Sequence, residues 1–354
     1  MKKKVFIILS SLTSGGTERV FWLISQYLDK NKYNVSIVLL DSKRSFFSHE
    51  IKDVQIIDLK SINASKSFFP LLALLKKEKP DAVFSTAGHI AVLVSLVSMF
   101  VKVPRLIARG EILPHKTTKS ASWYKELFYN VLSPYLYGRF DYVICQSAEM
   151  KAFYNQTIKI PLEKLRTISN PVVPTSIHVM EREPNNVKKL IIVARLANQK
   201  GHVRLLDVMK SLPDNYELSI AGDGPLRDEI AQKIKDLNLS NRVKMWGVVS
   251  NSRELMAEHD LLVLSSFTEG FPNVVVESLS IGLPTVTFDV SGISEIIQNG
   301  FNGFIVPQND LEQFKEKIIE STNTDWDSIA IKNDAFQKFS IDKIVKQYEI
   351  LIEA

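Results

Sequence analysis

The stretch DLLVLSSFTEGFPNVVVE, which runs from Asp260 to Glu277, contains the pattern around which the rest of the chain can be interpreted. Its first part, Asp260 to Ser266, is an apolar run with the length of a buried strand, and a second apolar run, Val274 to Leu279, predicts a helix. Open α/β sheets bind their ligands at the carboxyl ends of strands. The loop between the two runs is therefore where we expect a ligand.

The residues of this loop indicate a polyol and phosphate site. Pro272 suits the first helical position, so Gly270 to Asn273, with Phe271 among them, turns into a helix N-terminus. Carboxylates such as Glu269 and Glu277 accept hydrogen bonds from sugar hydroxyls, and a helix N-terminus favours an anion. The alternative is that Glu269 is a solvated loop residue and Glu277 an ordinary glutamate in the first or second turn, stabilised by the helix dipole.

The composition is that of a soluble globular protein with two domains. The chain has 354 residues, of which 45% are hydrophobic and 23% charged, and this length predicts two cores. The single cysteine, Cys145, excludes an internal disulfide and has the apolar neighbours of a core residue. The apolar run after Lys4 is too short for a signal peptide, and the longest run, Ile90 to Val101, is too short to span a membrane. We expect a cytoplasmic protein that is at most peripherally attached to a membrane.

The charge is divided unevenly between the two halves. Residues 1–180 contain 25 Lys and Arg against 13 Asp and Glu, a net charge of +12, whereas residues 181–354 contain 19 against 26, a net charge of −7. The basic half predicts an anionic partner such as a membrane surface, a phosphorylated acceptor or a nucleic acid, with solubility alone as the alternative. Nucleic acid is disfavoured because the predicted strands lack the aromatic platforms of an RNA-binding sheet.

The first half alternates strands and helices, which predicts a parallel sheet covered on both faces. The expected strands are Val5 to Leu9, Asn34 to Leu40, Val54 to Leu59, Ala82 to Ser85, Arg105 to Ala108 and Asp141 to Cys145, and the expected helices are Glu18 to Leu28, Phe69 to Lys77 and Ile90 to Phe100. The loop after the first strand contains Gly15, Gly16 and Thr17. It either lets the backbone approach a phosphate at a helix N-terminus or is a plain turn.

Later loops of the first half carry His89, Arg109 and Glu111 at strand ends, where a doubly wound domain has its ligand crevice. Each of these residue types is more often an ordinary surface residue. Residues 122–140 interleave aromatic and basic side chains. This pattern suits a membrane interface or a helix packed against the sheet.

After a polar linker at residues 181–187, the second half repeats the architecture of the first. The expected strands are Lys189 to Ala194, Glu217 to Ala221, Val243 to Trp246, Leu261 to Leu264 and Thr285 to Phe288. The sequence therefore predicts two doubly wound Rossmann-like domains that face each other across a cleft. Arg195 and Lys200 follow the first of these strands and can neutralise a diphosphate without a metal, or form a solvated basic loop. Gly222 and Gly224 predict a close approach of backbone, and Asn302-Gly303 predicts a turn.

Five motifs resemble the retaining glycosyltransferases of family 4, which have the GT-B fold. They are SGGTERV (Ser14 to Val20), ARLxxxKG (Ala194 to Gly201), AGDGPL (Ala221 to Leu226), WGV (Trp246 to Val248) and EGFPNVVVE. They occur in the order of the family and span nearly the whole chain.

The resemblance implies a role for each matching residue. Glu269 would hold hydroxyls of the donor sugar, Glu277 the ribose, and Arg195 with Lys200 the diphosphate. The other implied donor-binding residues are Gly15, Gly16, Thr17, Gly222, Gly224, Val248, Gly270, Phe271, Pro272 and Asn273. No cofactor or metal is expected. Many relatives carry a histidine after the strand that ends at Ala108, whereas this chain has Arg109-Gly110-Glu111, so Arg109, Glu111 or His89 would serve the acceptor or the first-domain site.

We interpret the sequence as that of a retaining, metal-independent glycosyltransferase of envelope polysaccharide or glycan biosynthesis. It would move a hexose or N-acetylhexosamine from a UDP-sugar to a lipid-linked or saccharide acceptor, at the inner face of the membrane. Residues 1–180 would bind the acceptor, residues 187–337 would bind the donor, and the helix in residues 338–354 would cross back to the first domain. The alternatives are a UDP-sugar 2-epimerase of the same fold and a non-catalytic, basic membrane-binding protein.

Overall fold

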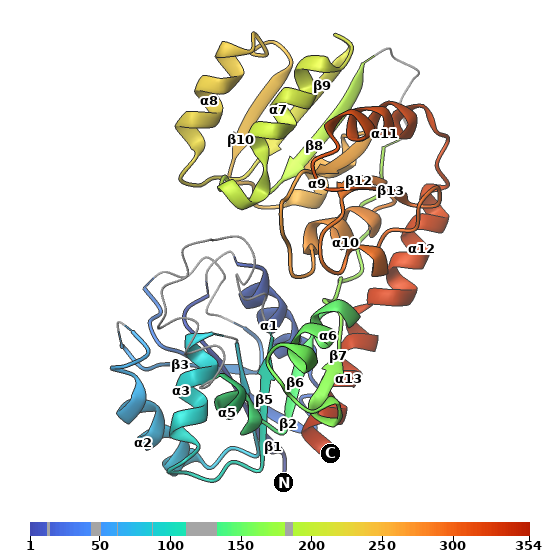
Figure 1. Ribbon diagram of the computed structural model, residues 1–354. Helices are drawn as coiled ribbons and strands as arrows, with labels where there is room; N and C mark the ends of the chain where they lie inside the picture. Colours follow the sequence, from blue (N-terminus) through green and yellow to red (C-terminus); the bar gives the residue numbers. More distant parts are fainter. Residues whose placement is uncertain (13–14, 44–50, 62, 87, 111–132, 181–186) are drawn as a thin grey trace. The chain divides into compact units, whose positions relative to one another are not determined.

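The computed structural model describes residues 1–12, 15–43, 51–61, 63–86, 88–110, 133–180 and 187–354. These residues form two units (Figure 1). Unit 1 is Met1–Pro171 together with Ile341–Ala354, and unit 2 is Val172–Ser340. Each unit has its own parallel sheet. The predicted fold class, two Rossmann-like α/β domains, is confirmed.

Unit 1 contains a sheet of seven strands in the order β3-β2-β1-β4-β5-β6-β7. The strands are β1 (Lys3–Leu9), β2 (Tyr33–Leu39), β3 (Val54–Asp58), β4 (Ala82–Ser85), β5 (Arg105–Arg109), β6 (Tyr142–Cys145) and β7 (Leu165–Thr167). The chain builds outward from β1 to β3 and then returns to place β4 on the other side of β1. The point of reversal lies between β1 and β4, and this is where an open sheet binds ligands.

Helices cover both faces of the unit 1 sheet. They are α1 (Gly16–Tyr27), α2 (Phe68–Glu78), α3 (His89–Val97), α5 (Ser133–Gly138), α6 (Ala148–Gln156) and α13 (Ile341–Glu353). Alternate strand residues point to opposite faces, so Val83 packs among α2, α3 and α6, whereas Phe84 contacts Phe21 of α1 and Tyr348 of α13. The C-terminal helix α13 therefore completes the core of unit 1, where it packs against α1 (Figure 1).

Unit 2 contains six strands in the order β10-β9-β8-β11-β12-β13. The strands are β8 (Lys188–Val193), β9 (Tyr216–Ala221), β10 (Val243–Gly247), β11 (Leu261–Leu264), β12 (Thr285–Phe288) and β13 (Gly303–Val306). The helices are α7 (His202–Ser211), α8 (Arg227–Asp236), α9 (Ser252–Ala257), α10 (Asn273–Leu279), α11 (Leu311–Asn323) and α12 (Ser328–Phe339). Leu190 and Ile192 face α7, α8 and α11, and Ile191 between them faces α9, α10 and α12.

The boundaries of the units differ from those expected at residues 180 and 337. Residues 172–180 belong to unit 2 because they bond to its backbone: Val172 N donates to Phe339 O at 2.8 Å, and Val179 N donates to Ile281 O at 3.0 Å. Ile177 also packs against the core of unit 2. The linker expected at residues 181–187 lies largely outside the described residues.

Strand β13 was not predicted, because Asn302-Gly303 reads as a turn. In the structure Gly303 begins the strand and pairs with Thr285 of β12. Its φ is +153°, and a Cβ there would lie 1.9 Å from the carbonyl oxygen of Thr285. The glycine is therefore required by the close approach of two backbones rather than by a turn.

Replacing Gly303 by Ala should destabilise the protein more than replacing Gly300 by Ala. Gly300 also has a positive φ, +78°, but a Cβ there meets no heavy atom within 4 Å. Both changes cost about 1 kcal/mol for the left-handed backbone, and the clash at Gly303 adds ~1–3 kcal/mol. Urea unfolding measures the difference, and equal midpoints for the two variants would contradict this role of Gly303.

Candidate active site

The reversal of strand order in unit 2 lies between β8 and β11. The loop after β8 and the loop after β11 therefore open side by side at the carboxyl edge of the sheet, where ligands of such sheets bind. The first loop carries Arg195 and Lys200, and the second carries Glu269. The topology thus brings together the two motifs on which the predicted donor site depends.

Lys200 and Glu269 form an ion pair across this reversal point. The ammonium of Lys200 lies 2.6 Å from Oε1 and 2.8 Å from Oε2 of Glu269, and the hydroxyl of Ser266 donates to Oε1 at 2.6 Å. Glu269 is only 7% exposed, so the carboxylate is held by charge-assisted hydrogen bonds in a largely desolvated place. The hydrogen bond from Ser266 was not predicted. Its position three residues before Glu269 could have suggested it, because a hydroxyl at that spacing can reach the carboxylate.

Backbone contacts fix the two loops to each other. Ser265 Oγ donates to the carbonyl oxygen of Lys200 at 3.0 Å, and Phe267 N donates to Gln199 O at 2.8 Å. Gly201, which follows Lys200, has a φ of +66°, and a Cβ there would lie 2.0 Å from the carbonyl oxygen of Ser265. The Lys-Gly pair of the motif is therefore explained by packing: the glycine lets the β11 strand end approach the lysine.

The glycines after β9 also serve a contact between loops. Gly222 has a φ of +138°, and a Cβ there would lie 2.0 Å from the carbonyl oxygen of Ala194. A Cβ on Gly224 would lie 2.4 Å from the carbonyl oxygen of Leu196. The predicted close approach of backbone is therefore made to the neighbouring Arg195 loop. Arg195 itself is exposed on that loop.

Helix α10 begins one residue later than predicted. Pro272 is the residue before the helix, with φ −75° and ψ 94°, and Asn273 is the first helical residue. Glu277 therefore lies in the second turn, where it accepts a hydrogen bond from Ser252 Oγ at 3.3 Å. Phe271 is buried and contacts the ring of Phe339. Gly270, between Glu269 and Phe271, is partly exposed.

Val248 lies after β10 and is 62% exposed. The neighbouring Gly247 has a φ of +71°, and its carbonyl oxygen accepts a hydrogen bond from Gly222 N at 2.7 Å. Trp246 is also partly exposed, and the ammonium of Lys244 lies 3.6 Å from the centroid of its ring. The ends of β8, β9 and β10 thus carry part of the predicted donor set, namely Arg195, Lys200, Gly222, Gly224 and Val248, along one edge of the sheet.

Arg204 is a residue that the sequence reasoning missed. Its Nε and Nη2 donate to the carbonyl oxygens of Ser265 at 2.8 Å and Ser266 at 2.6 Å, and its guanidinium lies 3.8 Å from the ring centroid of Phe267 and 3.9 Å from that of Phe288. Burial lowers the pKa of Arg204 to about 10. The arginine therefore holds the strand end from which Glu269 extends. The sequence feature that could have indicated this role is the position of Arg204 within the apolar pattern of α7.

His202 begins α7 and is 1% exposed. Neither ring nitrogen has a hydrogen-bond partner in the part of the chain that the structure describes. Burial, with a smaller contribution from the charge of Lys200, lowers the pKa of His202 to about 4. The imidazole is therefore neutral in the folded protein at neutral pH.

This burial predicts a loss of stability in mild acid. Between pH 6.5 and about 4 the unfolded chain binds a proton at His202 that the folded chain does not, so the free energy of unfolding falls as the pH is lowered, by up to ~3 kcal/mol. Replacing His202 by Leu should reduce this fall. Urea titrations at pH 7 and pH 4.5 measure it, and an unchanged pH dependence in the variant would argue against a neutral, buried His202.

In unit 1 the predicted residues lie around the β1/β4 reversal point. Gly15 precedes α1, Gly16 and Thr17 are in its first turn, and His89 is the exposed first residue of α3. Arg109 ends β5 and is buried. Glu111 and residues 122–132 of the aromatic stretch lie outside the described residues.

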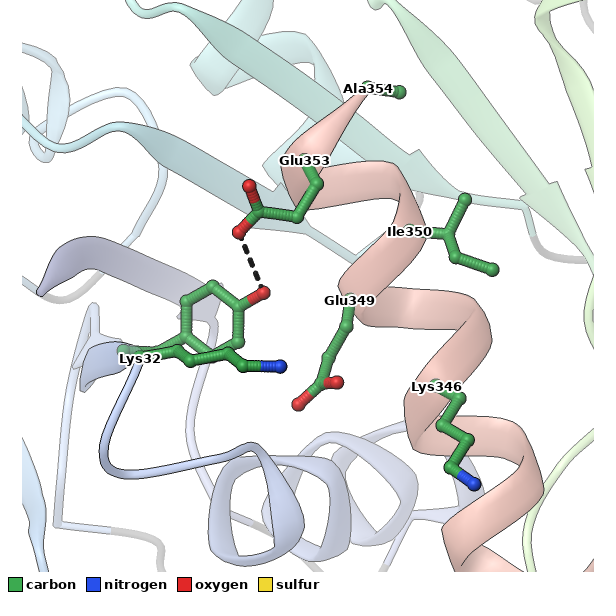
Figure 2. Close-up of a pocket in the computed structure, with 7 residues that line it drawn as sticks. Lys32, Lys346, Glu349, Ile350, Glu353 and Ala354 are labelled. Atoms are coloured by element: carbon green, nitrogen blue, oxygen red, sulfur yellow. Dashed lines mark hydrogen bonds between the residues drawn. The ribbon is translucent and has the colours of Figure 1, made fainter.

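A surface hollow of about 530 Å³ lies elsewhere on unit 1 (Figure 2). It is lined by Lys32, Tyr33, Lys346, Glu349, Ile350, Glu353 and Ala354. Tyr33 stands at the amino end of β2, the edge opposite to the one where such sheets bind ligands. Glu353 already pairs with Lys3 at 2.6 Å and accepts a hydrogen bond from the hydroxyl of Tyr33 at 2.8 Å. The hollow is therefore separate from the predicted site.

Two family models match the chain. The model described as Glycosyltransferase Family 4 matches residues 14–176, and the model described as Glycosyl transferases group 1 matches residues 175–335. The two matches meet near the boundary between unit 1 and unit 2. The chain belongs to the glycosyltransferases that these models describe, and the resemblance predicted from the five motifs is confirmed.

The relatives agree with this family, and a solved structure shares the fold. The chain is 25% identical to an alpha-1,4-N-acetyl-D-galactosaminyltransferase of Campylobacter jejuni, named for a PP-undecaprenol-linked acceptor, over 99% of this chain and 98% of the relative. It is 24% identical to an Escherichia coli UDP-Gal:alpha-D-GlcNAc-diphosphoundecaprenol alpha-1,3-galactosyltransferase, over 90% of this chain and 87% of the relative. Its fold is similar to that of Anabaena HepE in complex with UDP-glucose, with a TM-score of 0.80, 19% identity and coverage of 99% and 100%.

Within the described residues, no helix combines the length and the apolar character that a membrane span requires.

Proposed function

We propose that this protein is a retaining, metal-independent glycosyltransferase that moves a hexose or N-acetylhexosamine from a UDP-sugar to a lipid-linked saccharide acceptor. The observation that carries the proposal is the contact between Lys200 and Glu269 at the β8/β11 reversal point. A cation for a diphosphate and a carboxylate for sugar hydroxyls are the two groups that a nucleotide-sugar site needs, and here they touch.

The chemistry of transfer assigns a task to each group. The bond between the anomeric carbon and the donor phosphate breaks, and UDP leaves with the electron pair. The acceptor oxygen bonds to the anomeric carbon on the same face, and its proton passes to the leaving phosphate. Lys200 and Arg195 stabilise the negative charge that develops on this phosphate, and Glu269, once Lys200 turns to the diphosphate, accepts from sugar hydroxyls.

The choice of UDP and of a lipid-linked acceptor is supported by the relatives. The E. coli relative is named for UDP-Gal and a diphosphoundecaprenol-linked acceptor, and the C. jejuni relative for a PP-undecaprenol-linked acceptor. We assign the backbone around Val248, just after β10, to the base and Glu277 to the ribose. No catalytic nucleophile is required, because the carboxylates bind the donor rather than attack it.

Replacing Glu269 by Gln or Lys200 by Met should lower the rate of transfer at least ~100-fold, because each change removes a charge that faces the reacting groups. Lys233→Met and Asp207→Asn, which break a more exposed ion pair of 2.8 Å in the same unit, serve as controls and should keep the parental rate. Transfer is measured from UDP-hexoses and UDP-N-acetylhexosamines to isoprenoid diphosphate-linked saccharides, with and without EDTA.

Near-parental turnover by Glu269→Gln would overturn the assignment of Glu269 to the donor site. Loss of transfer activity in EDTA would overturn metal independence. The configuration of the new linkage, read by NMR, tests retention. Conversion of the UDP-sugar to its C2 epimer without an acceptor would favour the 2-epimerase instead.

A lipid-linked acceptor requires the enzyme to reach a membrane surface, and unit 1 carries features suited to this. The rings of Phe69 and Phe100 are 76% and 62% exposed, and both contact the ring of Phe68 between them. Exposed Lys66 and Lys102 lie close to them in sequence. Aromatic rings beside cations suit an anionic membrane interface, and we propose that this face attaches the protein peripherally to the inner side of the membrane.

Replacing both Phe69 and Phe100 by Ser should weaken retention on anionic vesicles, because the rings no longer enter the interface. Ile350→Ser, which removes another exposed apolar side chain of unit 1, is the matched control. Co-sedimentation with phosphatidylglycerol vesicles at low salt gives the bound fraction. Equal retention of the two variants would contradict the aromatic face, and failure of the parent protein to bind would contradict membrane association.

A further inference from the structure

Arg109 is a buried cation whose hydrogen-bonding groups are mostly unused. Its side chain is at the carboxyl end of β5 and is 3% exposed. Nη2 donates to Asn170 Oδ1 at 2.6 Å, whereas Nε and Nη1 have no acceptor among the described residues. An unpaired buried charge is strongly unfavourable, so a guanidinium in this state calls for an anion.

The charged and titratable groups around Arg109 do not accept hydrogen bonds from its Nε and Nη1. Glu18 of α1 and Tyr348 of α13 are near enough to influence its pKa, which burial lowers. Neither forms an ion pair or hydrogen bond with it within the described chain. The pKa of Glu18 is itself raised by burial, although Arg109 and His89 act in the opposite direction. The ring of Phe21 lies beside the guanidinium, 5.9 Å from its centroid.

The surroundings of Arg109 favour anions for a second reason. Helix α1 begins at Gly16 after Gly15, and α3 begins at His89 after Gly88, and neither helix has a side-chain cap. Both helices follow the strands β1 and β4 that border the reversal point of the unit 1 sheet, and β4 pairs with β5, so these N-termini and Arg109 share one edge. Helix N-termini attract phosphate groups through the helix dipole and through N–H groups that lack an intrahelical acceptor.

We propose that Arg109 anchors a phosphate-binding site in unit 1, and that the phosphate belongs to the diphosphate of the acceptor. This inference rests on the proposed function and narrows its acceptor to a diphosphate-linked saccharide. Arginine suits phosphate because its guanidinium stays charged and offers several donors. In the proposed function the diphosphate of the donor is assigned to Arg195 and Lys200 of unit 2, which leaves Arg109 of unit 1 for the acceptor.

Because Arg109 is only 3% exposed, side chains around the guanidinium must move when the phosphate enters. The competing interpretation is that Arg109 only holds Asn170, the residue before the Pro171 boundary of unit 1. A purely structural arginine affects folding but not the affinity for phosphate. The two interpretations therefore differ in a binding measurement.

The test uses inorganic pyrophosphate as the probe and the full chain carrying Arg195→Gln and Lys200→Gln, which removes the donor-side cations. Adding Arg109→Gln to this parent should raise the Kd of pyrophosphate at least tenfold in calorimetric titration. Arg105→Gln removes the same charge from the other end of β5 and should leave the Kd unchanged. An equal Kd with and without Arg109→Gln, or an equal effect of Arg105→Gln, would overturn the proposal.

Further measurements show whether the phosphate comes from the acceptor or from the donor, and they distinguish a failure of this inference from a failure of the proposed function. In the protein that keeps Arg195 and Lys200, saturating UDP should leave the Arg109-dependent binding of pyrophosphate in place. If UDP displaces this pyrophosphate, the site belongs to the donor, and the proposal that Arg109 binds the acceptor diphosphate is overturned. Arg109→Gln alone should raise the KM for a diphosphate-linked acceptor and leave the KM for the UDP-sugar unchanged. If Arg109→Gln does not fold, Arg109→Leu, which removes the buried charge and introduces no polar group in its place, replaces it, and an unweakened Kd then overturns the proposal. If UDP fails to bind the unaltered protein, the proposed function fails independently of Arg109.

Discussion

The ion pair between Lys200 and Glu269 joins two loops that are 69 residues apart in the chain. It exists because β8 and β11 are neighbours in the sheet although β9 and β10 separate them in sequence. The pair is reinforced by Ser266 and by the backbone contacts of the Lys200 loop, so the carboxylate has a defined place before any ligand binds. In the proposed function, the diphosphate and the hydroxyls of a nucleotide sugar replace this contact, each charge taking its own part of the donor.

Two buried arginines illustrate opposite uses of the same side chain. Arg204 in unit 2 has carbonyl acceptors and two aromatic rings around its guanidinium, so its charge is fully accommodated and it acts as a support for the β11 strand end. Arg109 in unit 1 has one hydrogen-bond partner, the neutral Asn170, and its Nε and Nη1 have no acceptor among the described residues. The contrast separates an arginine that completes the fold from one that is suited to a ligand.

Much of the architecture could be predicted from the sequence, because the strands are short apolar runs and the helices have clear periodicity. Three strands, Ala82–Ser85, Leu261–Leu264 and Thr285–Phe288, have the predicted bounds. Strand β13 was missed because Asn302-Gly303 has the composition of a turn, and its pairing with β12 is a long-range effect. Residues 172–180 were placed in the first domain, since nothing local reveals that their backbone bonds to Phe339 and Ile281.

The sequence by itself determined the fold class, the family and the identity of the donor-site candidates, because short motifs and hydrophobic periodicity are local properties. Only the tertiary structure decided that Lys200 and Glu269 touch, that Gly222 and Gly303 are required by the backbone of a neighbouring segment, and that Arg109 is buried with unused donors. Each of these facts depends on which strands lie side by side. The order of strands in a sheet is fixed by packing over the whole domain, and no single stretch of sequence contains it.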